Sequence, residues 1–251
     1  MNILKPYLTV LIVVAALQSC KKDNGQQAEP PAPVSEKAIV YTDSITFSLN
    51  NKIYAFDQRF TTGVGNQPVN IKKSASVIEG GKLAYETGGY HWYGVPDSTL
   101  YSVSYGFMLK ETSKRLSIYF NKKYNDKELQ KEGLLLKPKS NLEIFKVGNI
   151  PFAVDLDKEN TMDGVAIDFD NLTTKIPGAT ILVRSSLSTS IQNNSSFQIT
   201  KVEKLKDSIY LIEAKFEANL YDENAQLYRL KNGFMRIRTI VTPGSPGELF
   251  L

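Results

Sequence analysis

Cysteine, histidine and tryptophan are almost absent from this chain of 251 residues, which contains one of each. A zinc finger, a CxxC redox pair or a multi-histidine metal site needs several of these residues, so the composition excludes all three. With 16 glycines and 11 prolines, the chain has too few of both for a low-complexity fibre. Hydrophobic residues make up 42% of the chain and charged residues 22%, which is typical of a folded globular protein. We expect no bound cofactor.

The first twenty residues have the organisation of a lipoprotein signal peptide. Lys5 supplies the positive charge, and residues 7–17 form an apolar run that is shorter than the roughly 20 residues of a transmembrane helix. The next stretch, Leu17-Gln18-Ser19-Cys20, resembles a bacterial lipobox. This resemblance implies that residues 1–19 are removed and that Cys20 is acylated and holds the protein in a membrane. Because Cys20 is the only cysteine, we expect no disulfide.

A tether follows the cysteine. Residues 20–37 contain three prolines and, beyond alanine, a single aliphatic side chain, Val34, so they cannot bury a core and are predicted to be disordered. The junction Ser19-Cys20-Lys21-Lys22-Asp23 resembles those of Bacteroidetes lipoproteins, in which lysine and acidic residues after the cysteine act as a surface-export signal. Here two lysines precede a single aspartate. The resemblance implies the outer membrane and leaves both its periplasmic face and the cell surface open.

Hydrophobic periodicity from residue 38 onward is that of β-strands. Apolar residues alternate with polar ones over 212–220, which predicts a strand with one buried and one wet face. Asn50-Asn51 and Asn232-Gly233 predict hairpin turns, because these residues tolerate a positive φ. Further strands are predicted at 76–78, 82–86, 100–109, 115–120, 142–146, 152–155, 165–169, 180–183 and 197–202.

One short helix is predicted over 125–133, because Asn125 and Glu128 have the spacing of a capping box and Gly133 suits the position after the last turn. The fold class is therefore all-β, an antiparallel sandwich or barrel with one short helix. We expect residues 38–251 to form one domain. A division into two β units near 137–141 stays open.

The C-terminal third carries a family resemblance. The segments 197–202, 212–216 and 228–234 are similar to an ending shared by Bacteroidetes lipoproteins of unknown function, and residues 47–54 are similar to their opening strand. Asn51 and Ala214 stand where that family usually has glycine. The resembling residues are hairpin signatures, so the resemblance implies a β fold and no particular activity.

An acidic segment, 155–170, is a candidate calcium loop. An EF-hand is excluded, because Asn160 stands where that motif needs glycine and Ala166 where it needs a bidentate glutamate. An irregular site using Asp155, Asp157 and Asp163 is the hypothesis that stays open. Its alternative is an ordinary acidic turn before a strand with alternating faces.

The single histidine lies in an aromatic, glycine-flanked segment, Tyr90-His91-Trp92-Tyr93. No G-x-S-x-G motif accompanies His91, so the sequence does not predict a serine hydrolase. Amphipathic aromatic side chains suit a surface that stacks on a sugar ring or a peptide, and we take these four residues as candidate ligand-binding residues. The alternative is that Trp92 packs in the core.

Charged residues give no sign of catalysis or of nucleic-acid binding. Glu213 and Glu217 share a strand face, but a rise of about 3.4 Å per residue separates their Cα atoms by roughly 14 Å, against about 5–9.5 Å between glycosidase carboxylates. Basic residues are interspersed with acids and the formal net charge is only +4, which favours solvated strand faces.

Two function classes follow from the sequence. The favoured one is a non-catalytic envelope lipoprotein, a ligand-binding or accessory protein of the outer membrane whose partner is a glycan or an envelope protein. The alternative is a glycan-binding or glycan-acting protein that uses surface aromatics and carboxylates, and catalysis would need two acids converging from different strands.

Overall fold

The computed structural model describes residues 41–69, 78–79, 82–83, 98–109, 112–132, 135–138, 141–158, 160–177, 187–242 and 245–247. The signal peptide, the tether, Cys20, the aromatic segment 90–93 and the predicted strand 180–183 lie outside these residues, as do most of the predicted strands 76–78 and 82–86.

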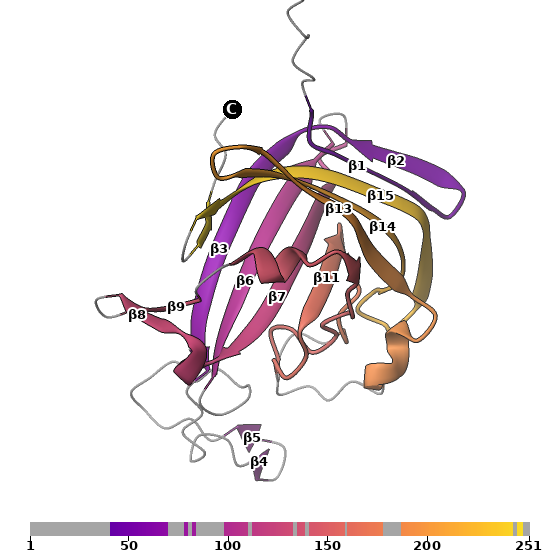
Figure 1. Ribbon diagram of the computed structural model, residues 1–251. Helices are drawn as coiled ribbons and strands as arrows, with labels where there is room; N and C mark the ends of the chain where they lie inside the picture. The colour runs from indigo at the N-terminus through magenta and orange to yellow at the C-terminus, as the bar shows by residue number, and fades with distance from the viewer. Residues whose placement is uncertain are drawn as a thin grey trace, which may run out of the picture. The chain divides into compact units, whose positions relative to one another are not determined.

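The structure is all-β and antiparallel, which confirms the predicted fold class. Its main sheet of twelve strands follows the order β2-β1-β15-β14-β12-β11-β7-β6-β3 and is nearly closed into a barrel-like shape, while β10, β13 and β16 pair beside this path (Figure 1). The strands of the main sheet are β1 (Ser44–Leu49), β2 (Lys52–Phe56), β3 (Arg59–Val69), β6 (Ser98–Met108), β7 (Arg115–Asn125), β10 (Gly148–Asn149), β11 (Gly164–Phe169), β12 (Leu172–Thr173), β13 (Ser196–Lys206), β14 (Ile209–Tyr221), β15 (Leu227–Thr242) and β16 (Ser245–Gly247).

The remaining elements are short. Two small hairpins lie apart from the main sheet, β4 (Ile78–Glu79) with β5 (Lys82–Leu83) and β8 (Gln130–Glu132) with β9 (Leu135–Lys137). The helical elements among the described residues are the 3-10 turns η2 (Asp126–Glu128), η3 (Asn141–Phe145) and η4 (Thr189–Gln192).

The core fills the concave side of the main sheet with alternating strand residues. Phe120 of β7 is fully buried and contacts Phe145 of η3 and Phe197 of β13, with ring centroids 5.2 and 5.7 Å apart. Phe47 of β1 meets Phe169 of β11 edge to face at 5.2 Å. Aromatic pairs in this geometry add to the stability that burial already provides. Phe169, the last residue of β11, is thereby packed against the β1–β2 hairpin.

The turn at Asn50-Asn51 is confirmed. Both residues have positive φ values, 51° and 61°, and Leu49 pairs directly with Lys52, so the loop is the two-residue turn that suits the twist of a hairpin.

The predicted hairpin at Asn232-Gly233 is wrong. β15 runs without interruption from 227 to 242, and Asn232, at φ 54°, lies in a bulge where Lys231 and Asn232 face the single residue Glu217 of β14. Both neighbouring strands pair with β15 across this point, so the chain continues with a local bend instead of reversing.

Three other local predictions are also wrong. The helix predicted over 125–133 is the single turn η2 followed by β8, although Asn125 does cap it by accepting a hydrogen bond from the backbone N–H of Lys127. This segment has only one large apolar residue, Leu129, and so no apolar stripe to bury. In the predicted strand 142–146, residues 142–145 belong to η3, whose Phe145 is inserted in the core. The segment 152–155 makes one isolated bridge, from Phe152 to Val165, and then turns.

Candidate functional site

Two adjoining cavities lie where the turns of three hairpins meet. The larger, of about 760 Å³, is lined by residues of the β1–β2, β11–β12 and β14–β15 hairpins and by Lys114, which precedes β7. The smaller has about 420 Å³. They share five residues, and we call this pair of cavities the paired cleft and the shared residues its wall: Asp170, Asn171, Leu172, Asp222 and Glu223. Both volumes are within the range of small-molecule sites, about 300–1,000 Å³.

Local hydrogen bonds build the wall. Asp222 starts the β14–β15 turn, and its Oδ1 accepts hydrogen bonds from the backbone N–H groups of Asn224 and Gln226 at 3.0 and 2.9 Å. Asp170, at φ 57°, makes the tight β11–β12 turn and forms an ion pair with Lys114. Aspartate suits such positions because its short side chain bonds to nearby backbone and tolerates a positive φ.

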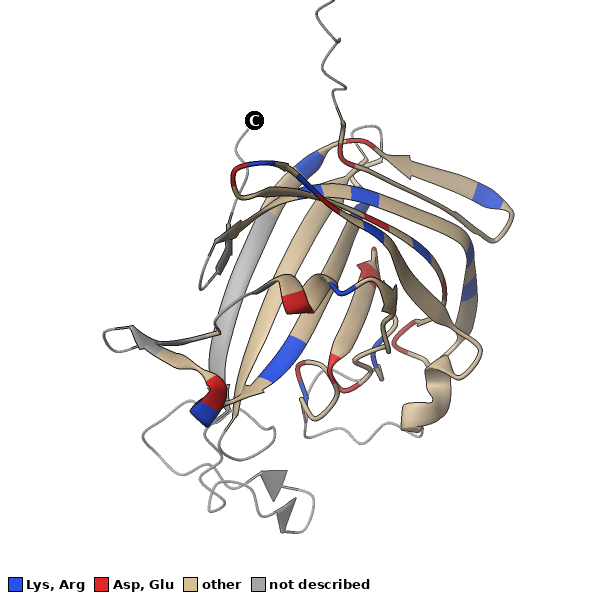
Figure 2. Cartoon of the chain, in the orientation of Figure 1, with Lys and Arg blue, Asp and Glu red and all other residues tan. Residues whose placement is uncertain are grey.

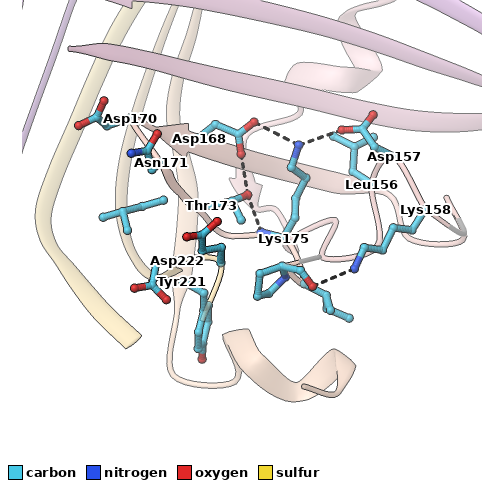
Figure 3. A pocket seen from close by; sticks show the side chains of 14 residues that line it. Leu156, Asp157, Lys158, Asp168, Asp170, Asn171, Thr173, Lys175, Tyr221 and Asp222 are labelled. Carbon is cyan, nitrogen blue, oxygen red and sulfur yellow. Dashed lines mark hydrogen bonds and ion pairs between the residues drawn. The ribbon is translucent and has the colours of Figure 1, made fainter. Parts of the chain in front are cut away.

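Lys175 organises the smaller cavity. Its Nζ lies between two carboxylates, 2.8 Å from Asp157 and 3.1 Å from Asp168, as Figure 3 shows. The same ammonium lies over the ring of Tyr119 at 5.2 Å, and Thr173 Oγ1 donates a hydrogen bond to Asp168 at 2.6 Å. Burial lowers the pKa of Lys175, but the two aspartates outweigh burial and raise it above its usual value. Lys175 is therefore charged and neutralises part of the acidic lining.

The other lysines of the cleft, Lys158 and Lys114, are also bonded to oxygen atoms of the protein. Lys158 donates to the carbonyl oxygen of Pro177 at 3.2 Å. The hydrogen bond to Asp170 raises the pKa of Lys114, whose ammonium also lies 5.5 Å from the ring centre of Phe169. Asp222 and Glu223, by contrast, form no ion pair within the described residues. The wall thus presents two carboxylates as hydrogen-bond acceptors to whatever enters either cavity.

Tyrosines border the larger cavity. Tyr54 of β2 stacks on Phe47 at 5.4 Å and meets Phe169 edge to face at 4.8 Å, so its ring is fixed by the core. Tyr228 of β15 is partly buried, and its hydroxyl lies 3.4 Å from Oδ2 of Asp222. A rigid aromatic body with a polar tip, next to carboxylates, suits contact with a ligand that has both apolar and hydroxyl-bearing faces.

The structure places the three candidate calcium ligands but does not bring them together. Asp155 is buried and accepts hydrogen bonds from the N–H and the hydroxyl of Thr161, both at 2.6 Å. Asp157 is paired with Lys175, and Asp163 accepts from the backbone N–H of Lys123 at 2.9 Å. Within the described part of the chain, no group of three or more acidic, histidine or cysteine side chains has the geometry to hold a metal ion. These three aspartates shape the loop and its connection to β11.

The other sequence candidates fall in two groups. Cys20 and the segment Tyr90, His91, Trp92 and Tyr93 lie outside the described residues. The strand carboxylates Glu213 and Glu217 each form an ion pair, with Arg236 and Arg229 respectively, both at 2.7 Å. Figure 2 shows positive and negative residues mixed along β13, β14 and β15, as expected for solvated strand faces.

Sequence reasoning missed the residues of the paired cleft. Asp168 and Asp170 fall at the end of the acidic segment 155–170 and outside its candidate calcium site, and Lys175, Asp222 and Tyr54 belong to no motif. The available signal was the acidic turn residue after each of two strands, Asp170 and Asp222, but nothing in the sequence indicates that these two turns meet.

Fold and cleft together define an all-β, barrel-like protein with an open polar cleft at hairpin turns. In comparisons with known proteins, the chain matches no family model, no curated protein and no solved structure. The described residues include no helix of sufficient length and apolarity to span a membrane.

Proposed function

We propose that the protein is a non-catalytic, lipid-anchored ligand-binding protein of the outer membrane, and that its ligand occupies the paired cleft. The main support for this proposal is the pair of carboxylates in the wall. Two cavities share Asp222 and Glu223, whose carboxylates form no ion pair among the described residues, while the lysines lining the same cleft are engaged.

The distribution of charge argues for binding over acid–base chemistry. Asp157 and Asp168 both hold Lys175, and Asp170 holds Lys114. Asp222 Oδ1 already accepts two backbone hydrogen bonds. Carboxylates fixed in this way act as acceptors for hydroxyl or N–H groups of a ligand. The lipid anchor on Cys20 and the outer-membrane location rest on the lipobox and on the junction that follows it.

A glycan is the ligand class that the larger cavity favours. Tyr54 and Tyr228 provide ring surfaces beside the acceptors Asp222 and Glu223, and sugars have C–H faces that stack on rings and hydroxyls that donate to carboxylates. The lysines that line the cleft, Lys114, Lys158 and Lys175, are already bonded to carboxylate or carbonyl oxygens of the protein. Because an acidic glycan would need such cations as partners, an uncharged glycan fits this cavity better.

A glycan array probed with the full-length chain tests this function. We expect uncharged oligosaccharides to bind, with weaker binding for Tyr228→Ala and for Glu223→Gln. Glu128→Gln, which removes the same charge from the exposed turn η2, serves as the control and keeps full binding. An array that stays silent, or binding that survives both cleft substitutions unchanged, overturns the assignment of a glycan to this cleft.

A further inference from the structure

A third cavity, of about 310 Å³, has a lining distinct from that of the paired cleft. Residues from β7, η3, β10 and the start of β11 line it. One of them, Asn121 of β7, is 4% exposed, and no donor among the described residues reaches its Oδ1. The Nδ2 group of Asn121 donates to the carbonyl oxygen of Gly164 at 3.4 Å, which is long for a hydrogen bond. The side chain is thus a buried amide whose acceptor is unused.

An unused acceptor is costly in the interior, and such groups are few in native proteins. Asn121 lines a cavity, so a ligand bound there would supply the donor that Oδ1 lacks. The cavity volume is at the lower end of the range for small-molecule sites, which limits the ligand to a small molecule.

Most charges around this cavity are already paired. Lys122 and Glu143 form an ion pair at 2.6 Å, and Asp163 is 3.0 Å from Nζ of Lys123. Lys146, which also lines the cavity, is exposed and has no ion pair among the described residues. Among the described residues, Asn121 Oδ1 is thus an acceptor without a donor and Lys146 is a cation without an ion pair, and both residues line this cavity.

The rest of the lining includes apolar surface. Val147, just before β10, is 57% exposed, and Ile150 follows directly after β10. An acceptor, a cation and an aliphatic surface in one small cavity match the three parts of an α-amino acid: its ammonium, its carboxylate and its side chain.

We propose that this cavity binds a free α-amino acid with an aliphatic side chain. The ammonium donates to Asn121 Oδ1, the carboxylate pairs with Lys146, and the side chain lies on Val147 and Ile150. Because Oδ1 is itself enclosed, binding requires side chains of the lining to move, and the lining includes the Lys122–Glu143 pair. Both partners of that pair are partly exposed, and such pairs are held only weakly.

Calorimetric titration of the purified full-length chain with leucine, valine, glycine and lysine tests the proposal. We expect leucine or valine to bind with a Kd below about 1 mM and to raise the melting temperature, and glycine and lysine to bind more weakly. Lys146→Gln weakens leucine binding by about two- to fivefold, as loss of an exposed ion pair predicts. Lys204→Gln, an exposed lysine of β13, is the control and leaves binding unchanged.

Asn121→Leu separates a ligand role from a purely structural one. If Oδ1 serves the ligand, the variant keeps its ligand-free melting temperature or raises it, because an unused buried acceptor is removed, and it loses the leucine-induced shift. If the variant is less stable and the unmodified chain binds none of the four amino acids, the amide is structural and the proposal is overturned. Equal binding of leucine by the unmodified chain and by Lys146→Gln also overturns it.

Discussion

Arg59 of β3 donates a hydrogen bond from Nη1 to the backbone carbonyl oxygen of Arg238 in β15, at 2.6 Å. These strands belong to opposite parts of the sheet order, so the bond joins the sheet to itself where it nearly closes. Asp43, just before β1, lies between them. Its carboxylate is 3.3 Å from Nη1 of Arg59 and 3.0 Å from Nε of Arg238. The first residues of the described domain thus hold the seam of the barrel together.

Asp43→Asn tests this seam. Both arginines and Asp43 are largely buried, so the substitution takes from both guanidinium groups the carboxylate that pairs with them, although Arg59 keeps its hydrogen bond to the carbonyl oxygen of Arg238. We expect the free energy of unfolding to fall by about 3 kcal/mol, as for other broken buried pairs. Urea unfolding of the full-length chain measures it.

Asp170→Asn is the matched control, because its partner Lys114 and Asp170 itself are substantially exposed. A loss of at most about 1 kcal/mol is expected there. Equal losses in both variants would show that the seam does not depend on the buried charge of Asp43.

Tyr105 makes a second contact across the seam, donating a hydrogen bond from its hydroxyl to Thr239 Oγ1 at 2.7 Å. Burial raises the pKa of Tyr105 well above the usual tyrosine value, although the hydrogen bond to Thr239 opposes the shift. In the unfolded chain this hydroxyl ionises near pH 10, whereas in the folded chain it keeps its proton. The unfolded state therefore binds fewer protons above about pH 10, and stability falls there.

Unfolding of the unmodified chain and of Tyr105→Phe at pH 8 and pH 10.5 checks this. The phenylalanine variant is expected to lose about 1 kcal/mol at pH 8, through the missing hydrogen bond, and to lose less than the unmodified chain on going to pH 10.5. An identical pH dependence in both proteins would mean that Tyr105 does not cause the alkaline loss.

Gly233 tests the bulge in β15. A Cβ at this position would lie 2.5 and 2.6 Å from ring carbons of Phe216 and 2.6 Å from its carbonyl oxygen. Gly233→Ala is therefore expected to destabilise the protein by about 2 kcal/mol, in the range of overpacked cores. The melting temperature measures it.

The double variant Gly233→Ala/Phe216→Leu keeps the backbone clash but removes the clash with the ring. We expect Gly233→Ala to cost less stability in the Phe216→Leu background than in the unmodified chain. If the cost is the same in both backgrounds, the ring of Phe216 is not what requires glycine.

The proposed lipid anchor on Cys20 makes a separate prediction. Cys20→Ser removes the only thiol of the chain. We expect the unmodified protein to take up labelled palmitate and sediment with membranes, and the variant to do neither, because acyl chains supply the membrane affinity. Asn24→Ser, a change in the same tether, is the control and keeps both properties. Membrane sedimentation of Cys20→Ser equal to that of the unmodified protein would contradict acylation as the anchor.

Two similar dipeptides show how far the sequence predicts this fold. Asn50-Asn51 and Asn232-Gly233 both favour a positive φ, and both contain one or two residues that adopt it. The first is a hairpin because only β1 and β2 meet there, and the second is a bulge because β1 and β14 pair with β15 on either side. Local sequence predicts the bend, and only the tertiary pairing decides whether the chain reverses.

The paired cleft could not be predicted from local sequence either, because it too depends on tertiary strand pairing. Strand periodicity predicted the buried face of β14, as Ile212 and Leu220 confirm. It could not place the turn at Asp170 beside the turn at Asp222, because β12 joins β11 to β14 through a single pairing, Thr173 with Tyr221. Long-range pairing of that kind has no local signature.

The measurement that tests the proposed binding function most directly is hydrogen exchange of the full-length chain, with and without an uncharged oligosaccharide that is positive on the array. Ligand binding in the paired cleft predicts slower exchange of backbone amides at residues 170–172 and 222–224, the two turns that form its wall. Slower exchange confined to other parts of the chain, with both turns unchanged, would contradict it.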